Sequence, residues 1–598
     1  MSRAILVCCD AGCLANGALD LYEALIRQVK EQKADASVVK SVKKTGCHGL
    51  CEAGPLVRIQ PDDIAYYQVR PEDAADIVSG LLSGRPVARL LYRDGEGRLH
   101  TSRAAHPFYA QQQKLALRNV GEIAPDSLDD ALERGAYQGL RKALTMSGED
   151  IISQIEASGL RGRGGAGFPT GRKWRTAAGY EAFPKYIVCN GDEGDPGAFM
   201  DRSILVGDPH SVLEGLAIGA LAIGAEEGFL YIRDEYDMAV RSVRQAIAQA
   251  EARGFLGDDM LGSGRKLHLS VVRGGGAFVC GESTALMASI EGRVGEPRAK
   301  YIRSVQRGLW DRPTVLNNVE TLANIPLIIT EGGAAFARLG TDNSKGTKVF
   351  ALVGKVKNTG LVEAPMGVTL RQLIFGLGGG VSGGRPFKAV QTGGPSGGCI
   401  PESMLDLPVD FDALVRYGAM MGSGGMIVMD DSSCMVEVAR YYVNFLCEES
   451  CGKCTPCREG LRQMLHILND ICQGQGQEGD IELLERLAHT LQDSALCALG
   501  KSAPNPVLTT IQYFREEYQA HLREHRCPAG VCTALTRFQI AADKCRGCTA
   551  CAKVCPVAAI NGQPRQAHTI DQSKCLVCGS CRAACKFAAI SVRGRDEL

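Results

Sequence analysis

The sequence lacks the features that would place a protein on nucleic acid, in a membrane or outside the cell. Its 67 Lys and Arg balance 67 Asp and Glu, and the basic residues are dispersed, which argues against nucleic acid as a partner. No uncharged apolar run is long enough to span a bilayer, because the longest, around 215–225, is short and follows Glu214. The N-terminus does not show the basic region, the apolar core or the cleavage site that make up a secretory signal. We therefore expect a soluble, cytoplasmic protein that inserts in no membrane.

Cysteine, in contrast, is abundant. At 598 residues the chain is too long for one hydrophobic core, and length alone suggests roughly four domains. The 45% hydrophobic and 22% charged residues are typical of folded proteins. The 25 cysteines are expected to be metal ligands rather than disulfides, because cytosolic thiols are kept reduced.

Two cysteine runs at the C-terminus have the spacing of a protein with two [4Fe–4S] clusters. Each reads Cys-x2-Cys-x2-Cys-x3-Cys, starting at Cys545 and at Cys575. Three thiolates of a run hold one cluster and the fourth reaches the other cluster. A zinc ribbon is the alternative, but zinc does not need eight regularly spaced thiolates. The predicted ligand sets are Cys545, Cys548, Cys551 and Cys585 for one cluster, and Cys555, Cys575, Cys578 and Cys581 for the other.

The N-terminal quartet is Cys8, Cys13, Cys47 and Cys51. Two loops that each supply two thiolates suit a planar [2Fe–2S] cluster, in which each iron takes two protein sulfurs. A zinc site with four sulfur ligands is the alternative, and Cys9 could replace Cys8.

A further three-plus-one set consists of Cys451, Cys454, Cys457 and the distant Cys497. Three ligands near a helix start and one from a later loop fit a single [4Fe–4S] cluster among helices. A helical bundle held together by zinc is the alternative.

Four other residues favour structural zinc because they form a mixed Cys3His set, although ordinary buried thiols are the alternative. This set is Cys472, His521, Cys527 and Cys532. Five cysteines have no ligand spacing and are predicted to be packing residues: Cys189, Cys280, Cys399, Cys434 and Cys447.

Between the cysteine-rich ends, strand-like runs at 186–188 and 228–232 alternate with a helix-like run at 238–252, which is typical of an α/β domain. We predict a multidomain α/β protein. Its parts are a compact α/β unit (1–92), a linker (93–129), a ligand-binding α/β domain (130–338), a β-grasp-like module (339–428), a helical [4Fe–4S] domain (429–520), a zinc-binding connector (521–535) and a two-cluster ferredoxin-like domain (536–598).

The α/β domain contains Gly-rich loops suited to a cofactor. The first, 159–174, includes a G-x-G-x-x-G match that follows a helix-like segment (151–158) rather than the strand of a Rossmann fingerprint. Its glycines still let the backbone approach a planar or phosphorylated ligand. Countercharge is available from Arg161, Arg163, Arg172 and Lys173.

The second loop follows a strand and carries Asn190, Asp192, Glu193 and Asp195. Carboxylates and amides bind sugar hydroxyls and ring N–H groups of a flavin or nicotinamide. The alternative is a solvated acidic turn. A third loop, 273–284, leads into a Ser/Thr-capped helix whose backbone N–H groups suit a phosphate. Together with 314–321, these loops favour a cleft for two ligands.

These motifs closely resemble the flavin-bearing, NADH-oxidising subunit of respiratory NADH dehydrogenase. The long versions in electron-bifurcating [FeFe]-hydrogenases and NAD-dependent formate dehydrogenases are more similar still, and the match covers nearly the whole chain. The most specific segments are 162–174, 190–201, 280–285, 317–322 and Cys451-Gly-Lys-Cys454-Thr-Pro-Cys457-Arg458.

The resemblance implies a thioredoxin-like N-terminal fold, a soluble ligand-binding β-grasp module in the middle, and zinc at the Cys3His set. It also implies FMN in the α/β domain, with NAD(P) stacked on the flavin and Glu193 close by. The cofactor-binding residues that it implies are Gly162, Arg163, Gly164, Gly165, Phe168, Lys173, Asn190, Asp192, Glu193, Phe278, Gly281, Glu282, Ser283, Asn317 and Asn318.

The implied activity is hydride exchange between NAD(P) and FMN, without a catalytic nucleophile, followed by single-electron transfer. The Cys451 cluster would be the first acceptor, and the N- and C-terminal clusters alternative exits. Branched exits are the arrangement that electron bifurcation with ferredoxin needs. We identify no [FeFe] or molybdopterin signature, so we expect a hetero-oligomer with a hydrogenase- or formate dehydrogenase-like catalytic subunit and a small [2Fe–2S] subunit.

Two departures from the family pattern concern the nucleotide. Ser283 replaces the second acid of a Glu-Glu pair, which removes repulsion of a 2′-phosphate. The family's Pro-Pro-Phe-Pro segment is replaced by one with Arg298, Lys300, Tyr301 and Arg303, which suits that phosphate. We hypothesise that NADP(H) is accepted. The alternatives are a non-catalytic cluster-bearing adaptor with a degenerate nucleotide site, and the beta subunit of an NAD(P)-dependent formate or aldehyde dehydrogenase.

Overall fold

The computed structural model describes residues 3–34, 39–299 and 301–594. The chain divides into two compact units, which are described separately. The first unit comprises residues 1–384, 391–394 and 403–428, and the second comprises 385–390, 395–402 and 429–598. Lys300, one of the cations assigned to nucleotide specificity, lies outside the described residues.

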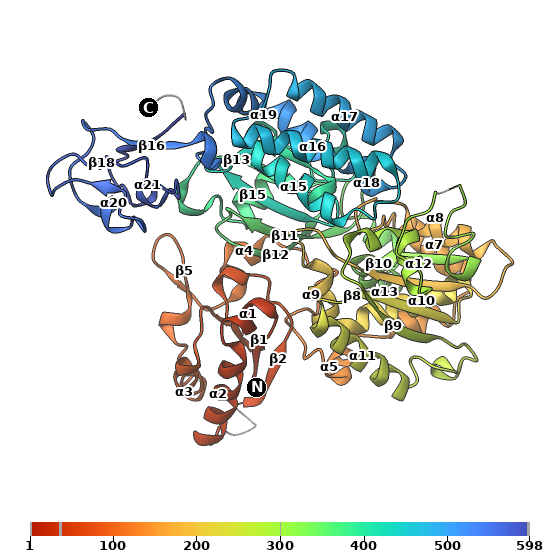
Figure 1. Cartoon of the computed structure of the whole chain (residues 1–598). Coiled ribbons are helices and arrows are strands. Elements are labelled where there is room, and N and C mark those ends of the chain that lie inside the picture. The colour runs from red at the N-terminus through yellow and green to blue at the C-terminus, as the bar shows by residue number, and fades with distance from the viewer. Residues whose placement is uncertain (1–2, 35–38, 300, 595–598) are drawn as a thin grey trace. The chain divides into compact units, whose positions relative to one another are not determined.

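The N-terminal part of the first unit, drawn in red in Figure 1, is a small sheet flanked by helices. Strand β1 (Arg3–Cys8) lies between β2 and β3, parallel to β2 and antiparallel to β3. Because β1 and β2 are parallel, their carboxyl ends lie at one edge, and each leads into a cysteine-bearing loop. The other elements are β2 (Val39–Thr45), β3 (Val57–Gln60), β4 (Ile64–Tyr66), α1 (Ala11–Ala15), α2 (Ala18–Glu31) and α3 (Ala74–Ser83).

Residues 93–129, predicted as a linker, are packed into the first unit. Ala116 and Leu117 are buried in its main hydrophobic core. The backbone N–H groups of Leu115, Ala116 and Leu117 all donate to the carboxylate of Glu363, at 2.9 Å each. Composition could not reveal this packing, because the acceptor lies far along the chain.

The ligand-binding domain is built on a parallel sheet with the strand order β10-β7-β8-β9. The carboxyl ends of these strands meet at one edge, where ligands bind in open α/β sheets. The strands are β7 (Tyr186–Gly191), β8 (Glu227–Arg233), β9 (His268–Gly274) and β10 (Thr314–Asn318). The helices of the first unit between residues 107 and 336 are α4 (Pro107–Ala110), α5 (Leu128–Glu133), α6 (Gln138–Ala143), α7 (Gly148–Ala157), α8 (Thr170–Ala178), α9 (Met200–Gly207), α10 (Pro209–Ile223), α11 (Asp237–Ala252), α12 (Ser283–Ile290), α13 (Val319–Glu331) and α14 (Gly333–Phe336).

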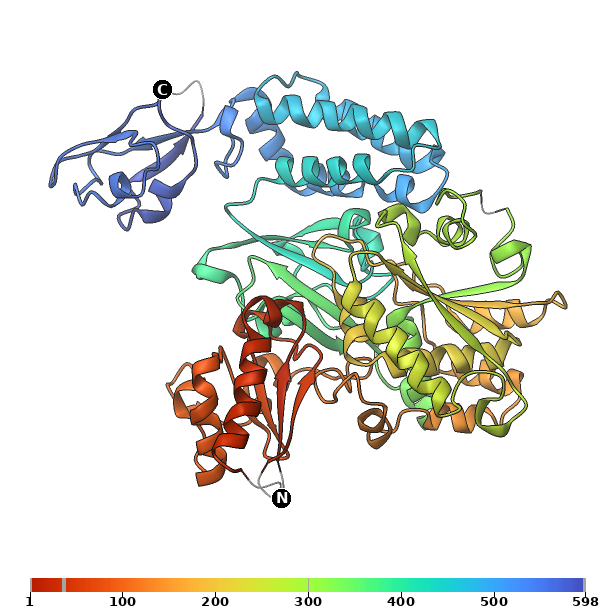
Figure 2. The ribbon, with the colours of Figure 1, turned by 60° about the horizontal axis from the view of Figure 1, so that its bottom comes forward.

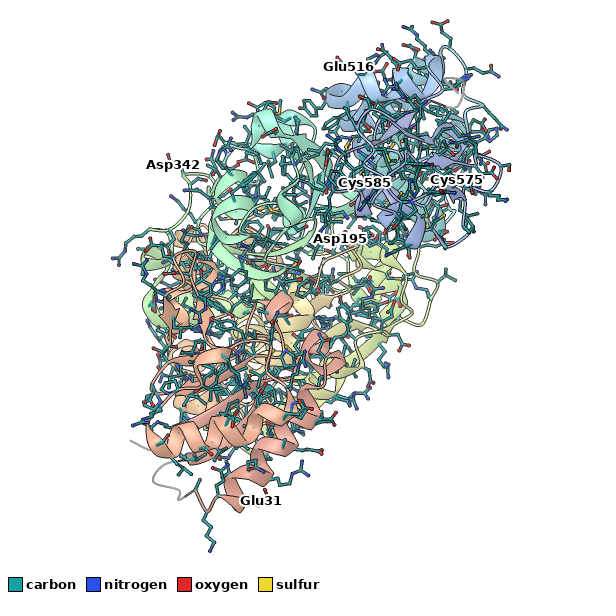
Figure 3. All side chains as sticks on the ribbon, turned by 90° about the vertical axis from the view of Figure 1, so that its left-hand side faces the viewer. Glu31, Asp195, Asp342, Glu516, Cys575 and Cys585 are labelled. Atoms are coloured by element: carbon teal, nitrogen blue, oxygen red, sulfur yellow. The ribbon has the colours of Figure 1, made fainter. Side chains whose placement is uncertain are left out.

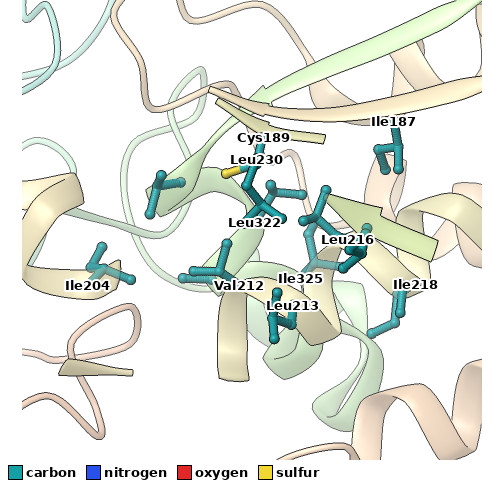
Figure 4. Packing of buried hydrophobic residues seen from close by; sticks show 14 of the residues in the cluster. Ile187, Cys189, Ile204, Val212, Leu213, Leu216, Ile218, Leu230, Leu322 and Ile325 are labelled. Atoms are coloured by element: carbon teal, nitrogen blue, oxygen red, sulfur yellow. The ribbon is translucent and has the colours of Figure 1, made fainter. Parts of the chain in front are cut away.

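The core of this domain packs α10 and α13 against the sheet. Figure 4 shows Leu216 of α10 and Leu322 of α13 beside the strand residues Cys189 and Leu230. Gly215 allows the close approach of the two helices, since a Cβ there would lie 2.2 Å from the backbone oxygen of Leu322. The core thus fixes β7 and the start of α13, which both supply loop residues of the candidate site.

The segment from 347 to 430 supplies short strands. In the first unit, β11 (Thr347–Gly354) pairs antiparallel with β12 (Gly360–Pro365) and parallel with residues 425–428 of β15 (Gly425–Asp430). Most of β13 (Phe387–Thr392) and all of β14 (Gly398–Pro401) belong to the second unit.

The second unit contains a bundle of helices that lie alongside one another, followed by a small domain of short strands and helices (Figures 1 and 2). The bundle consists of α15 (Met435–Glu449), α16 (Thr455–Gln473), α17 (Asp480–Ser494), α18 (Ala498–Ser502) and α19 (Asn505–Arg523). In the small domain, β16 (Arg537–Ile540) pairs with β19 (Ile590–Arg593), and β17 (Ile560–Asn561) pairs with β18 (Thr569–Ile570). Its helices are α20 (Ala550–Lys553) and α21 (Ser580–Ala584).

Within the described ranges, no single helix is both long and apolar enough to cross a membrane. The pair α9 and α10 passes this test by length and composition, with a bend of 96° between the two helices.

Candidate functional site

Four thiols meet where β1 and β2 end. Cys8 is paired with Thr45 in the sheet, two residues before Cys47. The Sγ atoms of Cys47 and Cys51 are 3.8 Å apart, and the Cys8 thiol interacts with both Cys13 and Cys47. The Cys13 thiol is the main reason why the pKa of Cys8 is raised well above its usual value. Such crowded, mostly buried thiols suit a metal that binds them as thiolates and releases their protons, so the residues fit a [2Fe–2S] cluster.

The loops predicted to bind a flavin converge at the carboxyl edge of the parallel sheet. A Cβ on Gly164 would lie 2.9 Å from the Cβ of Asn318, so the first Gly-rich loop passes directly over the end of β10. The Asn190 amide donates to the backbone oxygen of Gly281 at 3.0 Å. Lys173 donates to the backbone oxygen of Leu316 at 2.8 Å, so it also lies at β10.

Two further residues, Trp174 and Gly165, hold these segments in position. Trp174 is buried and donates its indole N–H to Asn317 Oδ1 at 2.9 Å. Gly165 has a φ of +118° and bridges to Gly422 of the following module. The structure therefore brings together Gly164, Lys173, Asn190, Gly281, Asn317 and Asn318 from four separate segments of the chain.

Buried carboxylates lie behind these loops. Glu193 accepts hydrogen bonds from the backbone N–H groups of Asp201 (3.0 Å) and Arg202 (3.1 Å). Burial raises the pKa of Glu193, and burial together with the Glu193 charge raises the pKa of Asp201 well above its usual value. Burial also raises the pKa of Asp195 to about 6, although Ser423 donates to this carboxylate at 2.6 Å. Burial therefore favours the protonated form of all three carboxyl groups.

Arg163 does not supply the countercharge that the sequence suggested. Its side chain is fully buried and donates to the backbone oxygens of Thr347 (3.0 Å), Arg161 (2.8 Å) and Lys345 (2.6 Å). Burial lowers its pKa to about 10. The guanidinium thus holds β11 against the Gly-rich loop. The backbone N–H of Arg163 is also engaged, because it donates to the Thr321 hydroxyl at 2.8 Å. The sequence contains no signal for this role.

The predicted nucleotide-binding residues surround the start of α12. Glu282 caps this helix, accepting from the N–H groups of Thr284 (2.8 Å) and Ala285 (3.1 Å) and from the Ser283 hydroxyl (3.1 Å). Phe278 lies beside Gly194, where a Cβ would be 2.8 Å from its ring. Arg233 was not identified from the sequence; it donates to the backbone oxygen of Glu193 at 2.7 Å.

Phe168 is 36% exposed, and Tyr301 in the substituted segment is 94% exposed. Arg303 and Arg307 are also exposed. The backbone N–H of Arg298 donates to the Thr284 hydroxyl at 3.0 Å, which ties the segment to the start of α12.

In the helical bundle, Cys454 precedes α16 and Cys497 precedes α18 as the N-cap residue of each helix. Burial, together with the nearby thiols of Cys454, Cys497 and Cys451, raises the pKa of Cys457 to about 11. Ser450 Oγ is 3.2 Å from Cys457 Sγ. The four thiols are therefore neighbours, and the positive end of the 19-residue helix α16 favours an anionic cluster. These residues fit a [4Fe–4S] cluster.

The C-terminal domain has two small cavities lined by cysteines. One is lined by Cys545, Cys548, Cys551 and Cys585, and the other by Cys555, Cys575, Cys578 and Cys581. Each cavity thus takes three cysteines from one run and one from the other, as cluster binding requires. Cys575 and Cys585 are labelled in Figure 3, in the C-terminal part of the ribbon.

The structure brings three members of the predicted zinc set together with a fourth residue, Cys434. The ligand atoms of Cys434, His521, Cys527 and Cys532 are buried and lie within 4.8 Å of one another. Cys434 Sγ is 3.4 Å from His521 Nε2 and 3.9 Å from Cys532 Sγ. His521 Nδ1 lies 2.7 Å from the Glu517 backbone oxygen, which leaves Nε2 for a metal.

Cys472, which the sequence placed in the zinc set, instead groups with Glu437 and Cys532. Cys434, which the sequence assigned to packing, is the fourth member of the first group. It sits at the N-cap of α15, far from the other ligands in the chain, so no local spacing marked it.

Family models match four parts of the chain. Residues 2–82 match the thioredoxin-like [2Fe-2S] ferredoxin, and 155–327 match the Nuo51 FMN-binding domain. Residues 437–521 match the NADH-ubiquinone oxidoreductase-F iron-sulfur binding region, and 544–589 match the 4Fe-4S dicluster domain.

Similar proteins extend over most of the chain. It is 51% identical over 458 residues to NADP-reducing hydrogenase subunit HndC of Solidesulfovibrio fructosivorans, covering 77% of this chain and 93% of HndC. It is 46% identical over 417 residues to the NADH-quinone oxidoreductase F 2 subunit of Rhizobium meliloti (strain 1021), covering 70% and 99%. A crystal structure of NAD+-reducing [NiFe]-hydrogenase in the H2-reduced state aligns with a TM-score of 0.61 and 30% identity, covering 87% and 84%.

Fold and sites together define a multidomain flavin and iron–sulfur subunit of NAD(P)H-linked oxidoreductases. The chain belongs to the family of the NADH-quinone oxidoreductase F subunit and its hydrogenase counterparts. The predicted resemblance is thus confirmed, as are the thioredoxin-like, FMN-binding and cluster-binding parts of the fold. The β-grasp-like module, the domain boundaries and the individual ligand residues stay predictions.

Proposed function

We propose that this chain exchanges electrons with NAD(P)H at FMN and passes them singly to partner subunits of a cytoplasmic complex. The observation that carries the proposal is the meeting of four chain segments at the carboxyl edge of the β10-β7-β8-β9 sheet, where Gly164, Asn190, Gly281 and Asn318 approach one another. When bound, FMN exchanges a hydride with the nicotinamide and releases electrons one at a time, which links NAD(P)H to the clusters.

The residues of this chain bind and orient rather than react. Gly164 lets the backbone approach a flat ring system, and Lys173 supplies positive charge beside it. Glu193 and Asp201 are buried, which excludes water from one side of the site. No side chain among these is required as a nucleophile.

We also propose that NADP(H) is accepted. Two observations support this: Glu282 already accepts from the N–H groups at the start of α12, and the neighbouring residue is the neutral Ser283. Arg303 and Arg307 place exposed positive charge in a segment tied to the same helix. The relative HndC is named as a subunit of an NADP-reducing hydrogenase. Steady-state kinetics with NADH and NADPH test this, and a strong NADH preference would contradict it.

The expected partners are a hydrogenase- or formate dehydrogenase-like catalytic subunit and a small [2Fe–2S] subunit. We propose that electrons leave by more than one cluster, which electron bifurcation with ferredoxin would use. Cysteine sets in three separate family-matched regions support this. Purification of the native complex identifies the partners. Reduction of ferredoxin only when the second acceptor is also present would demonstrate bifurcation.

A further inference from the structure

His568 is buried in the C-terminal domain with one ring nitrogen unsatisfied. The residue is only 2% exposed. Its Nδ1 lies 3.0 Å from the backbone oxygen of Gln566, while its buried Nε2 has no hydrogen-bond partner among the described residues. A buried polar atom without a partner costs free energy, so Nε2 indicates a group that binds there and completes its hydrogen bonding.

His568 lines one of the two cysteine-lined cavities. The cysteines of that cavity are the predicted ligands of one [4Fe–4S] cluster, namely Cys545, Cys548, Cys551 and Cys585. Two other polar residues line it, but Arg546 is exposed and Thr549 is half-buried. His568 is therefore the buried polar side chain that this cavity offers beside its thiols.

The loop that carries His568 is held against the first cysteine run. This loop, 562–568, joins β17 to β18. The backbone N–H of Arg565 donates to the backbone oxygen of Gly547 at 2.9 Å, and Gly547 lies between Cys545 and Cys548 in the chain. Gly562 leaves room for the ring, since a Cβ there would lie 2.6 Å from His568 Cγ. The packing of the loop therefore fixes the imidazole beside the cavity.

We propose that His568 Nε2 donates a hydrogen bond to a sulfur of the cluster in this cavity and raises the reduction potential of that cluster. The inference rests on the proposed function, since it requires that the four thiols hold a cluster. The Gln566 carbonyl only accepts, so Nδ1 carries a proton. Cluster sulfurs also accept, so Nε2 carries one too, and the ring is a cation. Hydrogen bonds to the sulfurs and nearby positive charge favour the reduced cluster, which has gained one electron while His568 keeps both protons.

The second cysteine-lined cavity has no counterpart of His568 among the described residues. Apart from its four cysteines, it is lined by apolar side chains and Gly579. The two cysteine runs have the same spacing, so the ligands alone give no reason for the two clusters to differ. His568 makes them unequal. The cluster beside His568 should have the higher potential, and an electron that enters this domain should come to rest there.

The test measures cluster potentials in the full-length, cluster-loaded chain by anaerobic redox titration with electron paramagnetic resonance. Cys548→Ser and Cys578→Ser each change one cavity and so identify its signal. His568→Leu should make the cluster of the first cavity at least about tenfold harder to reduce, which is about 59 mV for one electron, and leave the second unchanged. His568→Gln keeps an N–H donor without the charge and should show a smaller shift. His489→Leu changes an exposed histidine of α17 and should shift neither cluster.

An unchanged potential of the first cluster in His568→Leu would overturn the proposal, since Nε2 would then face only water. Equal shifts of both clusters would also overturn it, because a general disturbance of the domain produces them. Iron is measured on the same samples. Loss of about four iron atoms in both His568 variants would mean that His568 holds the cluster rather than tunes it. If only His568→Leu loses iron, the shift in His568→Gln decides. A wild-type chain without [4Fe–4S] signals would instead contradict the proposed function itself.

Discussion

Arg202 lies 3.4 Å from Asp10, measured from Nη2 to Oδ1, and so joins the N-terminal sheet to the flavin domain. Asp10 caps α1, which carries Cys13. The backbone N–H of Arg202 donates to Glu193 at 3.1 Å, and the Ser203 hydroxyl donates to Asp10 at 3.2 Å. Helix α9 therefore contacts the candidate flavin site and the predicted [2Fe–2S] site at once.

We predict that Arg202 and Asp10 shift the potential of the N-terminal [2Fe–2S] cluster in opposite directions. Arg202→Gln leaves the Asp10 carboxylate uncompensated and should lower the midpoint potential by tens of millivolts, on the order expected for a charge a few ångströms away. Asp10→Asn should raise it while keeping the cap of α1. A redox titration followed by electron paramagnetic resonance measures both, with Arg241→Gln as the remote control. Shifts of the same sign in both variants would contradict the account.

Zinc analysis distinguishes the two candidate ligand sets. Cys434→Ser should lower zinc from about one atom per chain to nearly none and destabilise the helical bundle, because a structural metal contributes directly to folding. Cys472→Ser should keep its zinc. Elemental analysis of zinc and iron on the same samples checks this. Loss of zinc in the Cys472 variant alone would restore the ligand set inferred from the sequence.

Nucleotide choice should respond to charge at residue 283. Ser283→Glu places a carboxylate beside Glu282, and repulsion of a 2′-phosphate should lower kcat/KM for NADPH by about 10- to 100-fold, with a much smaller effect on NADH. Ser283→Ala removes the hydroxyl without adding charge and serves as the matched control. If NADPH kinetics were unchanged in the Glu variant, Ser283 would have no part in selecting the nucleotide.

Asp195 should make the flavin-free protein less stable as the pH rises. Its folded pKa of about 6 lies above the usual value of 3.8, so the folded state binds more protons between these values. The protonated, neutral side chain of Asp195 stabilises the folded state fully below about pH 3.8. This stabilisation is lost as the pH rises to about 6. The loss is on the order of 1–3 kcal/mol. Asp195→Asn should remove the contribution of Asp195 to this slope, and so reduce the slope in thermal unfolding.

Ser423→Ala provides the matched comparison, because Ser423 donates to Asp195 and lowers its pKa. Without this hydroxyl, the fall in stability should extend to higher pH. An unchanged pH profile in both variants would mean that Asp195 stays ionised in the folded protein.

The sequence predicted those parts that depend on local spacing. Runs of cysteines three residues apart and apolar runs such as 186–188 carry their own signal, and the structure places β7 at the latter. Contacts between distant segments leave no such signal in the sequence. Cys434 joins the candidate zinc ligands from the start of α15, and Glu363 binds the backbone of the segment that was predicted to be a linker. From the sequence, Arg163 was expected to offer countercharge to a ligand. Its buried side chain instead donates to the backbone oxygens of Thr347 and Arg161.

The central claim is that one flavin feeds the clusters of this chain. Its most direct test is an anaerobic titration of the purified protein with NADPH and NADH, followed by visible spectroscopy and iron analysis. We predict a bound flavin that is bleached by at least one of these nucleotides, and about 14 iron atoms per chain, from one [2Fe–2S] and three [4Fe–4S] clusters. A colourless protein without iron, or a flavin that neither nucleotide bleaches, would contradict the account.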